Sequence, residues 1–92
     1  MTQSYQNVFA ALEEDTAVAK NLFIRSRLML EIRKYIKENK MTQKEASIKM
    51  GATQPRISDL MRGKIDLFTI DMLVSMLEKI GIDIEVSLNK AA

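Results

Sequence analysis

Apolar residues recur at the spacing of a helix face along much of the chain. Between Thr16 and Glu38 a set of apolar residues recurs at spacings of three, four and seven, namely Val18, Leu22, Leu28, Ile32, Tyr35 and Ile36. This pattern predicts an amphipathic α-helix. Its N-cap is expected at Asp15 or Thr16. A break near Arg25–Ser26 is compatible with the pattern, because one strict stripe does not run through the whole segment. Before the helix, Val8–Leu12 predicts a short helical turn or an anchoring segment.

Turn and capping residues mark the next element. Thr42 is a good N-cap, and Glu45 stands three residues later, which is the spacing of a capping box. Gly51 can adopt the left-handed conformation that a tight turn after a helix needs. The sequence therefore predicts a short helix over Gln43–Met50.

Two further helices are bounded in the same way. Thr53 is an N-cap, Pro55 falls in the first turn, where its missing N–H costs no helical bond, and Gly63 ends the helix. Thr69 and Gly81 bound a last helix with apolar residues at core spacing. The three glycines of the chain thus each follow a predicted helix.

The period changes to two over Ile82–Leu88, which predicts a half-buried strand. We expect a single domain over residues 1–92: an all-α, compact bundle of about five helices with one short C-terminal β-strand. Its parts are an N-terminal segment over residues 1–15, a central helix-turn-helix over residues 42–64 and the strand over residues 82–88. The strand has no second strand in this sequence to pair with, so it must pack on the helices or pair with another chain.

Composition excludes several function classes. The 92 residues suffice for one modest core, and the chain contains neither cysteine nor histidine. The commonest general base and the usual zinc ligands are therefore missing, so we expect no enzyme, no metal site and no cofactor. No apolar run approaches a membrane span and no secretory signal opens the sequence, so we expect a cytoplasmic protein.

Charge is distributed unevenly along the chain. The total is only +2, but residues 33–64 carry nine basic and three acidic side chains, a net charge of +6. The flanking segments, residues 1–32 and 65–92, carry −1 and −3. A basic centre of this kind suits a polyanionic partner, although a solvated helix surface is the alternative for any charge run.

Residues 42–64 combine that charge with a helix–turn–helix plan: a bracing helix, a tight turn and a second helix that can lie in the DNA major groove. The outward face of the second helix carries hydrogen-bonding side chains, namely Gln54, Arg56, Asp59 and Arg62. Basic residues that could hold phosphates flank it: Lys40, Lys44, Lys49 and Lys64.

The pattern Thr42-Gln43-x-Glu45-Ala46, then Gly51-x-Thr53-Gln54-x-x-Ile57-Ser58-x-Leu60-x-Arg62-Gly63-Lys64, resembles the Cro and phage-repressor (XRE-type) helix-turn-helix. That resemblance implies a lambda-repressor-like DNA-binding domain. It also implies base contacts by Gln54, Pro55, Arg56 and Asp59. Phosphate contacts are implied for Gln43, Lys44, Thr53, Arg62 and Lys64.

A narrower resemblance covers most of the chain. Asn7-Val8-Phe9, Gln54-Pro55-Arg56-Ile57-Ser58-Asp59-Leu60, Lys64-Ile65-Asp66-Leu67-Phe68 and Gly81-Ile82-Asp83-Ile84 are similar to HigA-like antitoxins. This implies a sequence-specific repressor that neutralises a RelE/HigB-like toxin and regulates their shared operon. A stand-alone phage-type or mobile-element repressor without a toxin is the alternative.

A single recognition helix contacts few base pairs, so a homodimer on a palindromic operator is expected. The strand over residues 82–88, or else the last helix, is expected to form the interface between the two copies, which we call the seam. The acidic N-terminal segment and the strand are the candidate toxin-binding regions, because a toxin of this class is expected to be basic.

Overall fold

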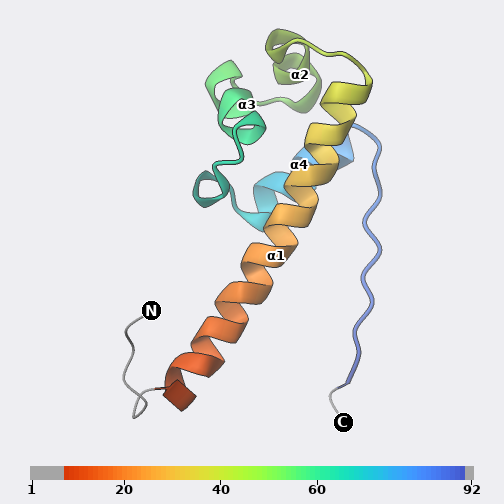
Figure 1. The fold of residues 1–92 in the computed structure, drawn as a ribbon. Coiled ribbons are helices and arrows are strands. Elements are labelled where there is room, and N and C mark those ends of the chain that lie inside the picture. The colour runs from red at the N-terminus through yellow and green to blue at the C-terminus, as the bar shows by residue number, and fades with distance from the viewer. Residues whose placement is uncertain (1–7, 91–92) are drawn as a thin grey trace.

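The computed structural model describes residues 8–90, with side chains from residue 15 onward. This part of the chain forms four α-helices and one 3₁₀ turn (Figure 1). They are α1 (Val8–Glu38), α2 (Gln43–Met50), α3 (Gln54–Met61), η2 (Ile65–Leu67) and α4 (Ile70–Lys79). The all-helical class and the three short helices are confirmed, whereas the expected total of about five helices is wrong for the described residues. The missing helix is absorbed into α1.

Helix α1 is one unbroken element of 31 residues that begins at Val8, not at Asp15 or Thr16. The break considered near Arg25–Ser26 does not occur. No proline or glycine lies between residues 8 and 38, and the Ser26 hydroxyl bonds inside the helix by donating to the Phe23 carbonyl oxygen at 2.8 Å. Nothing therefore stops the helix. Of the N-terminal segment, residues 8–15 form the start of α1, and residues 1–7 lie outside the described part.

The core lies where the C-terminal half of α1 packs on α4 and η2, with α2 and α3 packed on each other beside it. Its fully buried large side chains are Ile32, Met50, Ile57, Leu60, Phe68, Leu73 and Leu77. All described helices except η2 contribute to this set, so one core holds the helix-turn-helix against α1 and α4. Phe68, between η2 and α4, is only 1% exposed.

The N-terminal half of α1 extends beyond the cluster of α2, α3 and α4 (Figure 1). From residue 15 to residue 24, only Leu22 is partly buried. Val18, Phe23 and Ile24 expose large apolar side chains, with Phe23 at 65%. We call residues 15–24 the arm. No side chain among residues 15–90 buries Val18, Phe23 or Ile24.

The strand expected over Ile82–Leu88 is not formed. Ile82 donates its N–H to the Leu77 carbonyl oxygen at 3.1 Å, and from Asp83 to Lys90 the chain has no regular secondary structure and no backbone hydrogen bond to another described segment. The alternating sequence needs an adjacent strand, and residues 8–90 contain none. We call residues 83–90 the tail. Its apolar side chains Ile84, Val86 and Leu88 are exposed.

The capping residues predicted for the three short helices are confirmed. The Thr42 side chain accepts a hydrogen bond from the Glu45 N–H at 3.0 Å, and the Thr42 N–H donates to Glu45 Oε1 at 2.8 Å. Thr53 and Thr69 cap α3 and α4 with their hydroxyl oxygens. Gly51 adopts φ 65°, in the left-handed region. These local rules explain why the three short helices begin where the sequence predicts.

Replacing Thr42 by alanine should lower the free energy of unfolding by about 1 kcal/mol, because both bonds of the capping box depend on its side chain or its geometry. Chemical denaturation measures the change. Thr42→Ser is the control, since serine keeps the accepting oxygen and should stay within a few tenths of a kcal/mol of the parent. An alanine variant as stable as the serine variant would show that the cap does not stabilise α2.

Candidate nucleic-acid interface

Helices α2 and α3 meet through small and apolar side chains. Ala46 and Met50 of α2 and Ile57 of α3 are almost completely buried. The Ser47 hydroxyl donates to the Ala52 carbonyl oxygen and ties the end of α2 to the turn. The structure thus confirms a helix, a turn and a second helix at the predicted position.

Gly51 is required in that turn because of its backbone conformation. Its positive φ is strained for any residue with a Cβ. A Cβ at this position would lie 2.8 Å from Lys79 Nζ of α4, the flexible end of an exposed side chain that can move aside. The Lys79 ammonium group therefore lies close to the turn, at a pocket between the turn and α4.

Helix α3 has one buried and one exposed face. Ile57 and Leu60 point into the core, whereas Gln54 and Pro55 are exposed at its N-terminal end. Thr53 precedes them and caps the helix by accepting the Arg56 N–H at 3.2 Å. An amide side chain and an apolar ring at the exposed N-terminus of a second helix are suited to contacting base edges in the major groove.

The predicted phosphate-contacting residues are all exposed: Gln43, Lys44, Thr53, Arg62 and Lys64. Gln43 and Lys44 form the start of α2, Thr53 precedes α3, and Arg62 and Lys64 follow α3. These are the ends of the two helices, where long basic or amide side chains can reach a DNA backbone flanking the groove.

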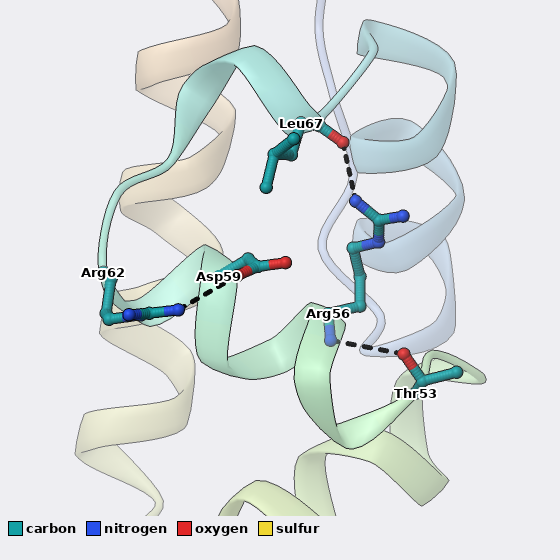
Figure 2. A network of polar contacts seen from close by, with 5 residues as sticks. All are labelled: Thr53, Arg56, Asp59, Arg62 and Leu67. Carbon is teal, nitrogen blue, oxygen red and sulfur yellow. Dashed lines mark hydrogen bonds and ion pairs between the residues drawn. The ribbon is translucent and has the colours of Figure 1, made fainter.

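Asp59 is engaged by a neighbour on its own helix. Arg62 Nη2 donates to Asp59 Oδ1 at 3.3 Å, and the two side chains are 60% and 21% exposed (Figure 2). An exposed i,i+3 pair of this kind contributes little to stability. Its consequence is positional: the carboxylate holds Arg62 against the end of α3.

The half-buried Arg56 side chain extends toward the segment that follows α3. Its Nη1 donates to the Leu67 carbonyl oxygen at 2.9 Å (Figure 2), and its guanidinium carbon lies 5.5 Å from the centroid of the Phe68 ring. Both contacts involve residues eleven or twelve positions later in the chain. The predicted base contact by Arg56 would require this side chain to leave both partners.

Arg25 is a site residue that the sequence reasoning missed. From α1 its Nη1 donates to the carbonyl oxygens of Ile65 and Phe68, at 3.1 and 3.4 Å. A signal was present: Arg25 stands three residues after Leu22 and four before Met29, on the side of α1 that packs on the core. A charged residue on an apolar stripe needs polar partners, and η2 supplies them.

Within residues 8–90 no group of three or more His, Cys, Asp or Glu side chains is arranged to hold a metal ion. No described helix is both long enough and apolar enough to cross a lipid bilayer. The features that stand out are therefore the helix-turn-helix, with its exposed α3 face and its exposed basic residues.

Comparison with known proteins agrees with that geometry. No curated protein matches the chain. A protein-family model described as a helix-turn-helix domain matches residues 8–89, which includes every described helix. The chain therefore belongs to the helix-turn-helix domain family of DNA-binding regulators.

Proposed function

We propose that the chain is a sequence-specific transcriptional repressor rather than an enzyme, and that α3 reads a palindromic operator in the major groove of double-stranded DNA. The observation that carries this proposal is the division of α3 into a buried face and an exposed N-terminal end that presents Gln54 and Pro55. Base specificity requires such a face, because phosphate contacts alone carry no sequence information.

Residue roles follow from position. Gln54 can pair bidentately with adenine, Pro55 can contact a thymine methyl group, and Asp59 can accept from a cytosine amino group or orient Arg62. The five exposed residues at the helix ends contact phosphates, namely Gln43, Lys44, Thr53, Arg62 and Lys64. Arg56 would join the base contacts only by giving up its bond to the Leu67 oxygen.

Lys64→Ala should weaken binding to all duplexes alike and reduce the slope of log affinity against log salt by about one, because one phosphate contact is lost. Fluorescence anisotropy at several salt concentrations measures both quantities. Lys90→Ala, a change of the same charge in the tail, is the control and should leave the slope unchanged. Equal slopes for the parent and the Lys64 variant would remove Lys64 from the phosphate contacts.

The repressor acts as a homodimer in this proposal. The unpaired backbone of the tail and its exposed Ile84, Val86 and Leu88 support a seam made by two tails. A symmetric antiparallel pair centred on Val86 sets Ile84 opposite Leu88 of the second copy and Glu85 opposite Ser87. A pair centred on Glu85 would instead oppose two like charges, which is unfavourable.

The mass in solution tests this seam, with twice the chain mass of 10.5 kDa expected. Val86→Lys places two like charges face to face on the symmetry axis and should give monomers. Asn89→Lys places the same new side chain opposite Asp83 of the second copy and should leave the dimer intact. A dimer unaffected by Val86→Lys would transfer the seam to α4, and a monomer with and without operator DNA would refute the dimer.

We further propose that this repressor is a HigA-like antitoxin that neutralises a RelE/HigB-like toxin encoded beside it. Charge and exposure support a basic protein partner. The arm exposes Val18, Phe23 and Ile24, and an acidic run, Glu13-Glu14-Asp15, lies at its N-terminal side. The tail adds exposed apolar residues beside Asp83 and Glu85. An apolar surface with acidic flanks suits a basic, apolar partner surface.

Co-purification with the product of each neighbouring gene separates this role from the alternative. A stoichiometric complex with a small basic protein that is toxic when expressed alone would support the antitoxin. A chain that elutes alone but shifts its own promoter DNA would be the stand-alone phage-type or mobile-element repressor. Deletion of residues 1–15 without loss of the complex would exclude that segment as the toxin-binding region.

A further inference from the structure

The short η2 turn cannot satisfy its own carbonyl groups. A 3₁₀ turn of three residues accepts few internal hydrogen bonds, and its remaining carbonyls need other partners. The Lys64 and Ile65 oxygens accept the N–H groups of Leu67 and Phe68, both at 3.1 Å. No backbone N–H of a described turn, loop or helix cap donates to the carbonyl oxygen of Leu67 or of Phe68. Arginine side chains donate to both of these oxygens, and one of them also donates to the Ile65 oxygen.

The first arginine comes from α1. Arg25 Nε donates to Asn21 Oδ1 at 2.6 Å, one helical turn earlier, and this bond orients the guanidinium. Its Nη1 then reaches the Ile65 and Phe68 oxygens, at 3.1 and 3.4 Å, in a partly buried position. A single side chain thus fixes both ends of η2 to the middle of α1.

The second arginine comes from α3. Arg56 Nη1 donates to the Leu67 oxygen at 2.9 Å, and the guanidinium lies over the ring of the buried Phe68. Figure 2 shows the side chain extending from α3 to the carbonyl of Leu67. The turn that leaves α3 is therefore held from α1 and from α3 itself.

We propose that Arg25 and Arg56 form a clamp on η2 that fixes the orientation of α3 for DNA recognition, so that Arg56 is a positioning residue and not a base reader. The clamp consists of Asn21, Arg25, Arg56 and the carbonyls of Ile65, Leu67 and Phe68. The inference rests on the proposed DNA binding by α3. It concerns which side chains prepare that helix, and it assigns Arg25 a role in recognition without contact to DNA.

Lysine substitutions test the clamp because they keep the charge and remove the geometry. A guanidinium can donate in two directions at once from a planar group, whereas an ammonium on a flexible stem cannot hold Asn21 and two carbonyls in the same way. Arg25→Lys should lower operator affinity about tenfold, with the salt slope and the preferred base at every operator position unchanged. Arg27→Lys, on the exposed side of the same helix, is the control and should bind as the parent does.

Arg56→Lys separates positioning from base reading. A positioning role predicts weaker binding with unchanged base preferences in a set of operators that differ at single base pairs. The Arg25→Lys, Arg56→Lys double variant should lose less affinity than the product of the two single losses, because both residues hold the same turn. Loss of preference at one base pair in Arg56→Lys would show that Arg56 reads that base, and would overturn its role in the clamp.

Amide NMR of the free protein tests the clamp without DNA. Arg25→Lys should shift the amide resonances of Leu67 and Phe68 and make these amides exchange with solvent faster. The amides of α2 should stay as in the parent. Asn21→Ala, a milder change at the exposed end of the clamp, should do the same more weakly if Arg25→Lys does not fold. Parent-like amides and affinity in both variants would overturn the clamp. A parent protein that binds operator and scrambled DNA alike would instead refute the proposed function, with the NMR result unaffected.

Discussion

Replacing Phe68 by alanine is expected to lower the free energy of unfolding by about 3–5 kcal/mol, which is a large part of the 5–15 kcal/mol typical of a native domain. The ring is 1% exposed and lies between η2 and α4. Its removal leaves a cavity in the core and takes away the surface on which the Arg56 guanidinium rests. Chemical denaturation followed by circular dichroism measures the change.

Phe23→Ala is the matched control for this measurement. The same side chain is removed, but Phe23 lies on the arm and is 65% exposed. The free energy of unfolding should therefore change by less than about 0.5 kcal/mol. If the two variants were equally stable, the core described around Phe68 would be incorrect.

Gln54→Ala is expected to reduce operator affinity by about 1–3 kcal/mol, or roughly 5- to 150-fold, and to remove the preference at one base pair. Gln54 is exposed at the start of α3, and its own amide forms none of the hydrogen bonds found among residues 15–90. It is thus available to a base edge without first leaving a partner. Competition binding with operators changed at single base pairs measures the effect.

Gln43→Ala is the control, because the same amide is lost from the start of α2, where a phosphate contact is proposed. It should weaken binding to operator and unrelated duplexes by similar factors and leave base preferences unchanged. Identical patterns for the two glutamine variants would mean that α3 does not read bases through Gln54.

The sequence predicts those elements that depend on local chemistry. Thr42, Gly51 and Thr53 set the ends of α2 and α3 through hydrogen bonds within a few residues and through one left-handed φ angle. The division of α3 into a buried and an exposed face follows from the spacing of Ile57 and Leu60 alone. Each of these features is encoded within one turn of helix, and each is found in the structure.

The errors arise where distant or intermolecular contacts decide. Alternation over Ile82–Leu88 predicts a strand, but a strand needs a neighbour, and residues 8–90 provide none. The apolar stripe of α1 does not run strictly through Phe23 and Ile24, which made a break near Arg25–Ser26 compatible with the sequence, yet the helix continues there and leaves both side chains exposed. In both segments the outcome depends on which partners the side chains and the backbone find, and the residue pattern does not specify those partners.

The candidate site shows the same division. The exposed ends of α2 and α3 could be located from the sequence because their positions follow from the caps. The orientation of Arg56 could not, since it depends on Leu67 and Phe68 after an intervening turn. Arg25 lies farther still from its partners, 40 residues before Ile65. Only the tertiary structure brings these groups together.

The central claim is that this helix-turn-helix reads a DNA sequence. Its most direct test is to titrate the chain with the DNA upstream of its own gene and with a scrambled duplex of the same length and composition, at one fixed salt concentration. We predict that the upstream DNA binds at least about 10³-fold more tightly, as specific sites do. Equal affinities that fall together as salt rises would show charge-driven binding without sequence recognition and would contradict the claim.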